Sequence, residues 1–228
     1  MNLDLGFTSS KTSVASFSLG NGLQFNGTDN FVQLSSSVDL GDFTYNVWLK
    51  YESTTRAFMA LFGNPSKPAD YLIYYPSNGK LSFRSEGYPQ LDFIGVNLVV
   101  GVSTMITIKR ELGQLNLYLN GVFHSSNSIG NNVLVINRLG SFFHYTNNYL
   151  WKGLQNELSI WSNPLTDMEI NQLYSNGNGS DASVIQANDL ELYFKMNGTG
   201  SDINILDSST NGNNGIFGGT ASNQWVTH

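Results

Sequence analysis

Residues 153–174 read Gly-Leu-Gln-Asn-Glu-Leu-Ser-Ile-Trp-Ser-Asn-Pro-Leu-Thr-Asp-Met-Glu-Ile-Asn-Gln-Leu-Tyr. This stretch predicts a strand followed directly by a short helix. The strand is indicated by Leu154, Leu158 and Ile160, which are apolar among polar neighbours. Pro164 ends it, because proline has no N–H to donate to a neighbouring strand. The rest of the chain predicts mostly β-structure, so this stretch marks the one place where a strand passes into a helix.

The helix has clear start signals. Thr166 is predicted as its N-cap, and Glu169, three residues later, completes a capping box. Leu165 before the cap and Ile170 inside the helix are spaced for a hydrophobic staple. These signals predict one short helix at residues 167–174.

Further strands follow between regularly spaced turn signals. Residues 43–50 alternate strongly, with their apolar residues on one face. Residues 71–75 and 80–85 flank a Pro-Ser-Asn-Gly turn and predict a hairpin. Asn120-Gly121 predicts a second hairpin with a type I′ turn, and residues 190–195 form the last clear strand.

The composition indicates one globular domain. With 228 residues, 13% aromatic and only 12% charged residues, the chain can bury one large core. We predict that residues 21–228 form a single domain. Residues 1–20 are polar and rich in Ser and Thr, which predicts an N-terminal arm or an edge strand.

Charge and cysteine content exclude several classes of function. The net charge is −6 and no basic cluster exceeds Lys109-Arg110, so nucleic-acid binding is not expected. The absence of cysteine excludes disulfides, thiol catalysis and zinc–thiolate sites. The longest apolar runs, such as residues 94–102, are too short and interrupted for membrane insertion. The N-terminus lacks the basic and apolar regions of a signal peptide, so export by that route is not expected.

Five short motifs resemble the laminin-G-like, concanavalin A-like jelly-roll family. Its closing strand and helix are matched in order by Gly153, Glu157, Trp161, Asn163, Leu165, Thr166 and Glu169. Its opening motif, its Phe-Thr-x-x-x-Trp-x-Lys strand, its Asn-Gly hairpin and its Asp-Ser-Ser loop resemble residues 23–34, 43–50, 118–122 and 206–215.

The resemblance implies an all-β fold, a jelly-roll sandwich of two antiparallel sheets with one short helix near residues 167–174. In this family the strand and loop that resemble residues 190–215 normally open the domain, whereas here they follow the helix. Either the chain is circularly rearranged, or it lends this strand to a neighbouring molecule.

The resemblance also implies a structural calcium ion. The matching positions are Asn26, Asp29, Asn156 and Glu157. Two of the four are Asn where the family usually has Asp, which weakens the attraction for Ca²⁺ although amide oxygens still coordinate it. The alternative is that these are turn residues whose side chains hydrogen-bond to nearby backbone.

Catalysis is not expected. Glycoside hydrolysis needs two carboxylates facing one sugar, and the Glu-x-Asp-x-x-Glu string of laminarinase-type jelly rolls does not occur. The three histidines, His124, His144 and His228, show no ligand spacing. A degenerate polysaccharide hydrolase remains a third-ranked hypothesis.

Carbohydrate binding needs aromatic rings for stacking and polar groups for the hydroxyls. We predict the ligand-binding residues to be Tyr74, Arg84, Tyr88, Phe142, Phe143, His144, Tyr145 and Asn147. Tyr71 and Tyr75 belong to the same aromatic group. The alternatives are that most of these rings lie in the core, or that they form a protein–protein contact.

The leading hypothesis is therefore a non-catalytic recognition or adhesion module that binds carbohydrate at a cell or particle surface. The alternative is a structural or decoration protein of a viral (phage) particle, acting through contacts with neighbouring subunits. Both place the protein outside the cell or on a virion surface, as a possible homo-oligomer or part of a larger assembly.

Overall fold

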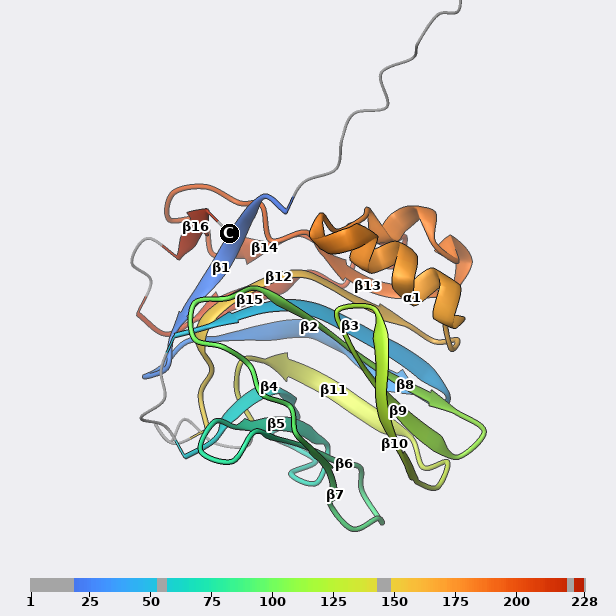
Figure 1. Ribbon diagram of the computed structural model, residues 1–228. Coiled ribbons are helices and arrows are strands. Elements are labelled where there is room, and N and C mark those ends of the chain that lie inside the picture. Colours follow the sequence, from blue (N-terminus) through green and yellow to red (C-terminus); the bar gives the residue numbers. More distant parts are fainter. Residues whose placement is uncertain (1–18, 53–56, 143–148, 221–223, 228) are drawn as a thin grey trace, which may run out of the picture.

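The computed structural model describes residues 19–52, 57–142, 149–220 and 224–227. Within these residues, two antiparallel sheets pack face to face, and a small helical layer covers part of one of them (Figure 1). This architecture confirms the predicted all-β jelly-roll sandwich with one short α-helix. The predicted arm at residues 1–20 lies almost wholly outside the described residues, and the domain boundary stays a prediction.

The first sheet, sheet A, has its strands in the spatial order β10 (Val122–Ser128), β9 (Gln114–Leu119), β8 (Thr104–Glu111), β3 (Phe43–Tyr51), β12 (Lys152–Trp161), β1 (Asn21–Asn26) and β16 (Trp225–Thr227), and β13 (Leu190–Phe194) also pairs with β12. Sheet B has the order β14 (Asn204–Ile205), β15 (Gly215–Gly218), β2 (Phe31–Leu40), β11 (Leu134–Leu139), β4 (Met59–Gly63), β5 (Tyr71–Tyr75), β6 (Lys80–Arg84) and β7 (Leu91–Ile94).

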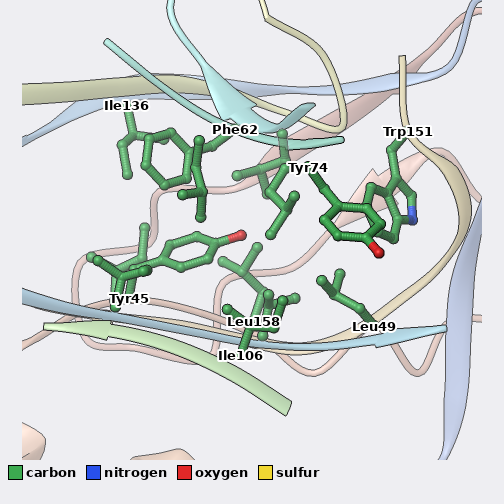
Figure 2. Packing of buried hydrophobic residues seen from close by; sticks show 14 of the residues in the cluster. Tyr45, Leu49, Phe62, Tyr74, Ile106, Ile136, Trp151 and Leu158 are labelled. Carbon is green, nitrogen blue, oxygen red and sulfur yellow. The ribbon is translucent and has the colours of Figure 1, made fainter. Parts of the chain in front are cut away.

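The main core lies between the two sheets and is built from alternate residues of each strand. In β3 the predicted inward face is confirmed, because Phe43, Tyr45, Val47 and Leu49 are all buried there. Figure 2 shows Tyr45 and Leu49 facing Phe62 and Tyr74 across this layer. The rings of Tyr45 and Phe62 meet edge to face, with centroids 4.9 Å apart. Each fully buried large apolar side chain contributes about 1.5–3 kcal/mol to stability.

A second, smaller core covers the other face of sheet A. It lies under α1 (Asp167–Tyr174) and the 3-10 turns η1 (Ser175–Gly177), η2 (Ala182–Val184) and η3 (Ala187–Asp189). Trp48 of β3 stacks on Tyr174, with ring centroids 5.7 Å apart. Leu165 and Ile170, the predicted staple, are both fully buried in this cluster. Sheet A is therefore covered on both faces at its centre.

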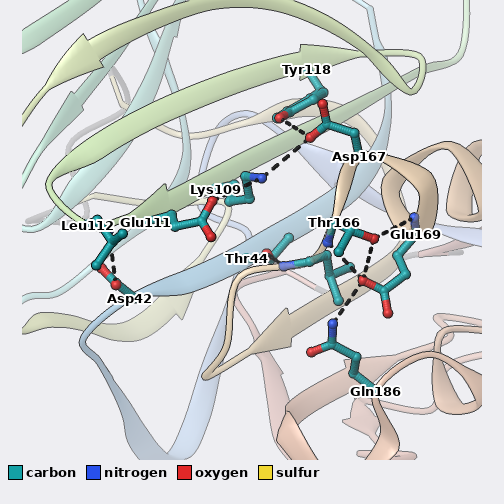
Figure 3. Close-up of polar contacts among 11 residues, drawn as sticks. Asp42, Thr44, Lys109, Glu111, Leu112, Tyr118, Thr166, Asp167, Glu169 and Gln186 are labelled. Atoms are coloured by element: carbon teal, nitrogen blue, oxygen red, sulfur yellow. Dashed lines mark hydrogen bonds and ion pairs between the residues drawn. The ribbon is translucent and has the colours of Figure 1, made fainter.

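The start of α1 is held by the predicted capping box, which is confirmed (Figure 3). The Thr166 backbone N–H donates to Glu169 Oε2 at 2.8 Å, and the Glu169 N–H donates to Thr166 Oγ1 at 3.3 Å. Polar contacts then fasten the helix to sheet A. Tyr118 donates its hydroxyl to Asp167 at 2.6 Å, and the Leu165 N–H donates to Thr44 Oγ1 at 2.8 Å.

A bulge interrupts β12 at its middle. Asn156 lies opposite Trp48 and Ser159 opposite Asn46, so two residues of β12 face one residue of β3 between these pairs. Glu157 in the bulge has a left-handed backbone with φ of 48°. As a result Leu158 and Ile160 enter the main core, whereas Leu154 does not. The bulge therefore places Leu158 and Ile160 on the opposite face of the sheet from Leu154, because an extra residue changes the face of all later residues.

The last forty residues complete both sheets. β13 pairs with β12 of the same chain, on the edge of β12 that also pairs with β1. β16 then pairs with β1, and β15 pairs with β2 in the other sheet. The strand at residues 190–194 therefore closes its own domain.

The basic pair Lys109-Arg110 lies inside the fold. Lys109 is 6% exposed and Arg110 is fully buried. Arg110 donates from Nη1 to the Asn132 carbonyl at 2.8 Å and from Nη2 to the Leu40 carbonyl at 2.9 Å. The Arg110 guanidinium therefore links the end of β2 to the segment just before β11 by hydrogen bonds and does not add to a basic surface. Among the helices of the described residues, none is long and apolar enough to cross a membrane.

Substituting Thr166→Ala removes the N-cap and should lower the free energy of unfolding by about 1 kcal/mol, measured by urea denaturation. Met168→Ala is the matched control, because Met168 lies in the same helical turn but is 81% exposed. Equal effects of the two substitutions would contradict a specific role for the cap.

The bulge residue Glu157 should make stability depend on pH. Burial raises the pKa of the Glu157 carboxyl from 4.5 to about 7, although Tyr193 donates a hydrogen bond to it. Between these values the folded protein holds a proton that the unfolded chain has lost, so stability falls as pH rises from 4.5 to about 7. Denaturation at a series of pH values should show this loss, and Glu157→Gln should reduce it. A Glu157→Gln profile parallel to that of the parent would contradict this prediction.

Candidate functional site

The outer face of sheet B presents an ordered array of side chains over its last three strands. Along β5 and β6 every second residue belongs to the main core, so the residues between them point outward. The strand registers align these outward residues in three rows: Tyr71 with Arg84, Ile73 with Ser82 and Asp92, and Tyr75 with Lys80 and Ile94. We call these eight residues the β5–β7 surface.

Aromatic rings from three segments gather at the β5 side of this surface. Phe58 stacks on Tyr149 with a centroid distance of 4.4 Å, and it meets Tyr75 edge to face at 5.6 Å. Phe142 contacts Tyr71 edge to face at 4.7 Å and Tyr149 at 5.3 Å. Four of the five rings are partly exposed, and Tyr71 is buried beneath them. The cluster therefore offers aromatic surface whose ring orientations are held by neighbouring rings.

Phe142 reaches the sheet because the chain crosses β4 at a glycine. A Cβ atom on Gly63 would lie 2.6 Å from the Phe142 Cα and 2.8 Å from its carbonyl oxygen. At the other end of the same connection, the Ala60 N–H donates to the Tyr149 carbonyl at 3.0 Å. Both ends of the connection between β11 and β12 are thus fixed against β4, which places their aromatic side chains over the outer face.

A polar network lies beside the rings. Asp92 accepts hydrogen bonds from Ser82 Oγ at 2.6 Å, Gln90 Nε2 at 2.8 Å and Lys80 Nζ at 3.0 Å. Tyr71 donates its hydroxyl to Gln90 Oε1 at 2.7 Å. Burial acts to raise the pKa of Asp92, but the hydrogen bonds from Ser82, Lys80 and Gln90 outweigh it, and the pKa lies below its ordinary value. The carboxylate is therefore charged near neutral pH and held in one position.

Two cations border the same rings. Lys80 Nζ lies 4.4 Å from the centroid of the Tyr75 ring, and the strand register places the two residues opposite each other. Arg84 is exposed, and its Nε donates to the Tyr88 carbonyl at 3.3 Å. The surface thus combines ring faces, N–H donors and carboxylate acceptors within one array.

The structure distributes the predicted ligand-binding residues unevenly. Arg84 lies on the β5–β7 surface and Phe142 in its aromatic cluster. Tyr88 is partly buried against the main core, next to Gly130. Phe143, His144, Tyr145 and Asn147 lie outside the described residues.

The structure contradicts the prediction that Tyr74 binds the ligand. Tyr74 is 1% exposed, it points into the main core (Figure 2), and its hydroxyl accepts the Leu98 N–H at 3.2 Å. The period-two alternation of β5 separates Tyr74 from Tyr71 and Tyr75, and this signal was available in the sequence. The sequence did not predict Phe58, Lys80, Gln90 and Asp92, because pairing across strands and loops brings them together.

The four predicted calcium ligands fall into two separate pairs. Asn26 at the end of β1 lies opposite Lys152, four residues before Asn156 in β12. Four residues of strand correspond to about 13 Å, which is too far for one ion to bridge. Asn156 itself accepts the Glu157 N–H at 2.7 Å.

Existing hydrogen bonds already use the oxygens of the first pair. Asn26 Oδ1 accepts the backbone N–H of Thr28 at 2.7 Å, and Asn26 Nδ2 donates to Asp29 Oδ1 at 2.7 Å. Asp29 Oδ2 accepts from Thr220 N and Oγ1 at 2.8 and 2.6 Å, and hydrogen bonds from Thr220 and Asn26 lower the pKa of Asp29. Within the described residues, no three His, Asp or Glu side chains form a group that could hold a metal. This arrangement does not fit calcium and agrees with the alternative of turn residues.

Asp29→Ala should therefore destabilise the fold by about 1 kcal/mol or more, with or without calcium, because Thr220 loses its acceptor. Thermal unfolding with added calcium and with a chelator measures this effect. If calcium stabilised the parent protein but not Asp29→Ala, the calcium hypothesis would stand and this interpretation would fail.

Comparison with known proteins adds three findings. Residues 26–171 match a family model described as the concanavalin A-like lectin/glucanases superfamily. An inferred carbohydrate-binding protein from Bacteroides ovatus superposes with a TM-score of 0.70 at 16% identity, covering 90% of this chain. The chain spans about 60% of the length of that protein.

A heptameric SAP-like pentraxin from Limulus polyphemus superposes with a TM-score of 0.57 at 14% identity, covering 71% of this chain and 84% of the pentraxin. No curated protein sequence matched the chain. At these identities the two structures support the fold alone. The family match spans well over half of the 228 residues and includes the strand and helix at residues 153–171, so the chain belongs to the concanavalin A-like lectin/glucanases superfamily.

Proposed function

We propose that this protein is a non-catalytic carbohydrate-binding module whose ligand lies on the β5–β7 surface. The observation that carries the proposal is the partly exposed aromatic cluster directly beside the polar network around Asp92. The Bacteroides ovatus protein with the same fold, whose name records an inferred carbohydrate-binding role, supports this assignment.

The chemistry of the surface suits a sugar ring. The apolar face of a pyranose packs on an aromatic ring, while its hydroxyl groups need donors and acceptors at the ring edge. Tyr75 supplies a partly exposed ring, Lys80 supplies N–H donors beside it, and Asp92 supplies acceptor oxygens. Because these side chains are already hydrogen-bonded and packed, little conformational entropy is lost when a ligand binds.

The same geometry argues against hydrolysis at this surface. A glycosidase needs one protonated carboxylic acid and a second carboxylate on the other side of the bond. Asp92 is the one carboxylate among the residues of the β5–β7 surface, and its lowered pKa keeps it ionised. The surface can therefore hold a sugar without the acid that bond cleavage requires.

The module would bind glycans of a cell surface or an extracellular matrix, and the protein would act outside the cell. The comparisons lend no support to the alternative of a phage particle protein.

A glycan array should identify oligosaccharides that bind the parent protein, and isothermal titration calorimetry should then measure the affinity of the strongest. Tyr75→Ala should weaken that affinity about fivefold, since loss of one stacked ring costs about 1 kcal/mol. Lys80→Ala should weaken it as well. Phe143→Ala and Tyr145→Ala, titrated with the same ligand, test the predicted residues that lie outside the described part of the chain.

The matched control is Phe123→Ala. Phe123 is an aromatic residue that is 51% exposed, but it lies on β10 of the other sheet. Its removal should leave binding unchanged. Equal affinity of Tyr75→Ala and the parent protein, or no glycan binding by the parent, would overturn the proposal.

A further inference from the structure

A second concave site lies at the opposite edge of the sandwich. It is a hollow of about 170 Å³ lined by Lys195, Met196, Asn197, Gly198, Asp202, Asn204, Ile205, Leu206, Ser208 and Trp225. All of these residues follow position 171, where the match to the superfamily ends. The hollow is therefore built entirely by residues that follow the matched segment.

One wall of the hollow is the indole of Trp225, which is fixed from two sides. A Cβ atom on Gly198 would lie 2.4 Å from the ring, so only glycine allows this approach. The indole Nε1 donates to the Asp202 carbonyl at 3.0 Å, and Gln224 Nε2 donates to the same oxygen at 2.8 Å. The ring is partly exposed and held in one orientation.

The remaining lining divides into an apolar floor and a polar rim. Met196 and Ile205 are 2% exposed and form part of the floor. At the rim, Lys195 Nζ is oriented by Asp181 Oδ2 at 2.9 Å, and Asn197 is exposed. The hollow thus offers a fixed aromatic ring, apolar contact and polar groups at its mouth, the combination that suits a small amphipathic ring.

We propose that this hollow binds a single pyranose, stacked against Trp225 and hydrogen-bonded at the rim by Asn197 and Lys195. Its volume is below the range of about 300–1,000 Å³ typical of drug-sized ligands, so it admits one sugar unit and not an oligosaccharide.

Another hollow, of about 250 Å³, has no aromatic residue in its lining of Ser35 to Asp39, Glu191 and Asn211 to Asn213. Its polar groups are already bonded to one another, as in the 2.8 Å contact between Ser35 Oγ and Asn213 Oδ1. It therefore suits a sugar ring less well than the Trp225 hollow.

The Trp225 hollow is separate from the β5–β7 surface. β14, which helps to line the hollow, is one edge strand of sheet B, and β7 is the other. β14 and β16 lie at the top of Figure 1 and β5, β6 and β7 at the bottom. Five strand steps from β14 to β5 correspond to about 24 Å, so the two sites would hold different sugar units.

Tryptophan fluorescence tests the hollow directly. Of the four tryptophans, Trp48, Trp151 and Trp161 are at most 3% exposed, so a bound sugar can change the emission only through Trp225. The parent protein is titrated with glucose, galactose, mannose and N-acetylglucosamine, and with the open-chain polyol sorbitol. At least one pyranose should give a saturable shift with a dissociation constant on the order of 1 mM, and sorbitol should give none.

Two variants that keep Trp225 localise the effect. Asn197→Ala, at an exposed position, should weaken binding about three- to tenfold by loss of one hydrogen bond. Ser208→Phe, also at an exposed position, should fill the hollow and abolish the shift, while Phe123→Ala should leave it intact.

Absence of a saturable shift with every pyranose would overturn the proposal, as would an equal shift with sorbitol or an unchanged shift in Ser208→Phe. The outcome is independent of the β5–β7 surface. If the fluorescence shift persists in Tyr75→Ala, it supports binding in the Trp225 hollow even when the glycan array finds no oligosaccharide. If Tyr75→Ala abolishes the shift while Asn197→Ala and Ser208→Phe retain it, the proposal for the hollow is refuted.

Discussion

The pairing of β3 with β12 at the centre of sheet A is the constraint on which the rest of the sandwich depends. Both strands are buried along almost their whole length, which requires apolar cover on two faces. The inward residues of β3 meet sheet B in the main core, and Trp48 on its outward face packs under Tyr174 of α1. A helix attached directly after β12 is therefore a structural necessity, because without it the outer face of sheet A would expose Trp48 and Trp161.

Because α1 and the 3-10 turns cover the outer face of sheet A, the two proposed binding sites lie elsewhere on the surface. The residues after α1 are used first to complete the second core and then to supply an edge strand to each sheet. Among the described residues, the outer face of sheet B is covered in part, by the two ends of the β11–β12 connection that lie against β4. Within the described part of the chain, the array over β5 to β7 stays partly exposed, and the segment after α1 forms the hollow at the other edge. Both proposed binding sites therefore lie on surfaces that the two cores do not cover.

Local signals in the sequence predicted the parts of the fold that depend on local physics. The helix at residues 167–174, its capping box and the Asn120-Gly121 hairpin were all correct, because a cap and a two-residue turn are decided by neighbouring residues. The candidate site was predicted less well. Arg84 and Phe142 lie in the proposed site, whereas Tyr74 lies in the core, on the face of β5 that simple alternation already separates from Tyr71 and Tyr75.

The sequence by itself determined the fold class, the single α-helix and the alternation that separates the two faces of β3 and β5. Tertiary structure alone decided which distant residues meet. The bulge at Glu157 reverses the face of the residues after it, and the approach of Phe142 to Gly63 joins residues almost eighty positions apart. Trp225 likewise meets Gly198 only because β16 returns to pair with β1. Such contacts depend on strand registers and chain crossings, which a local pattern of residues does not encode.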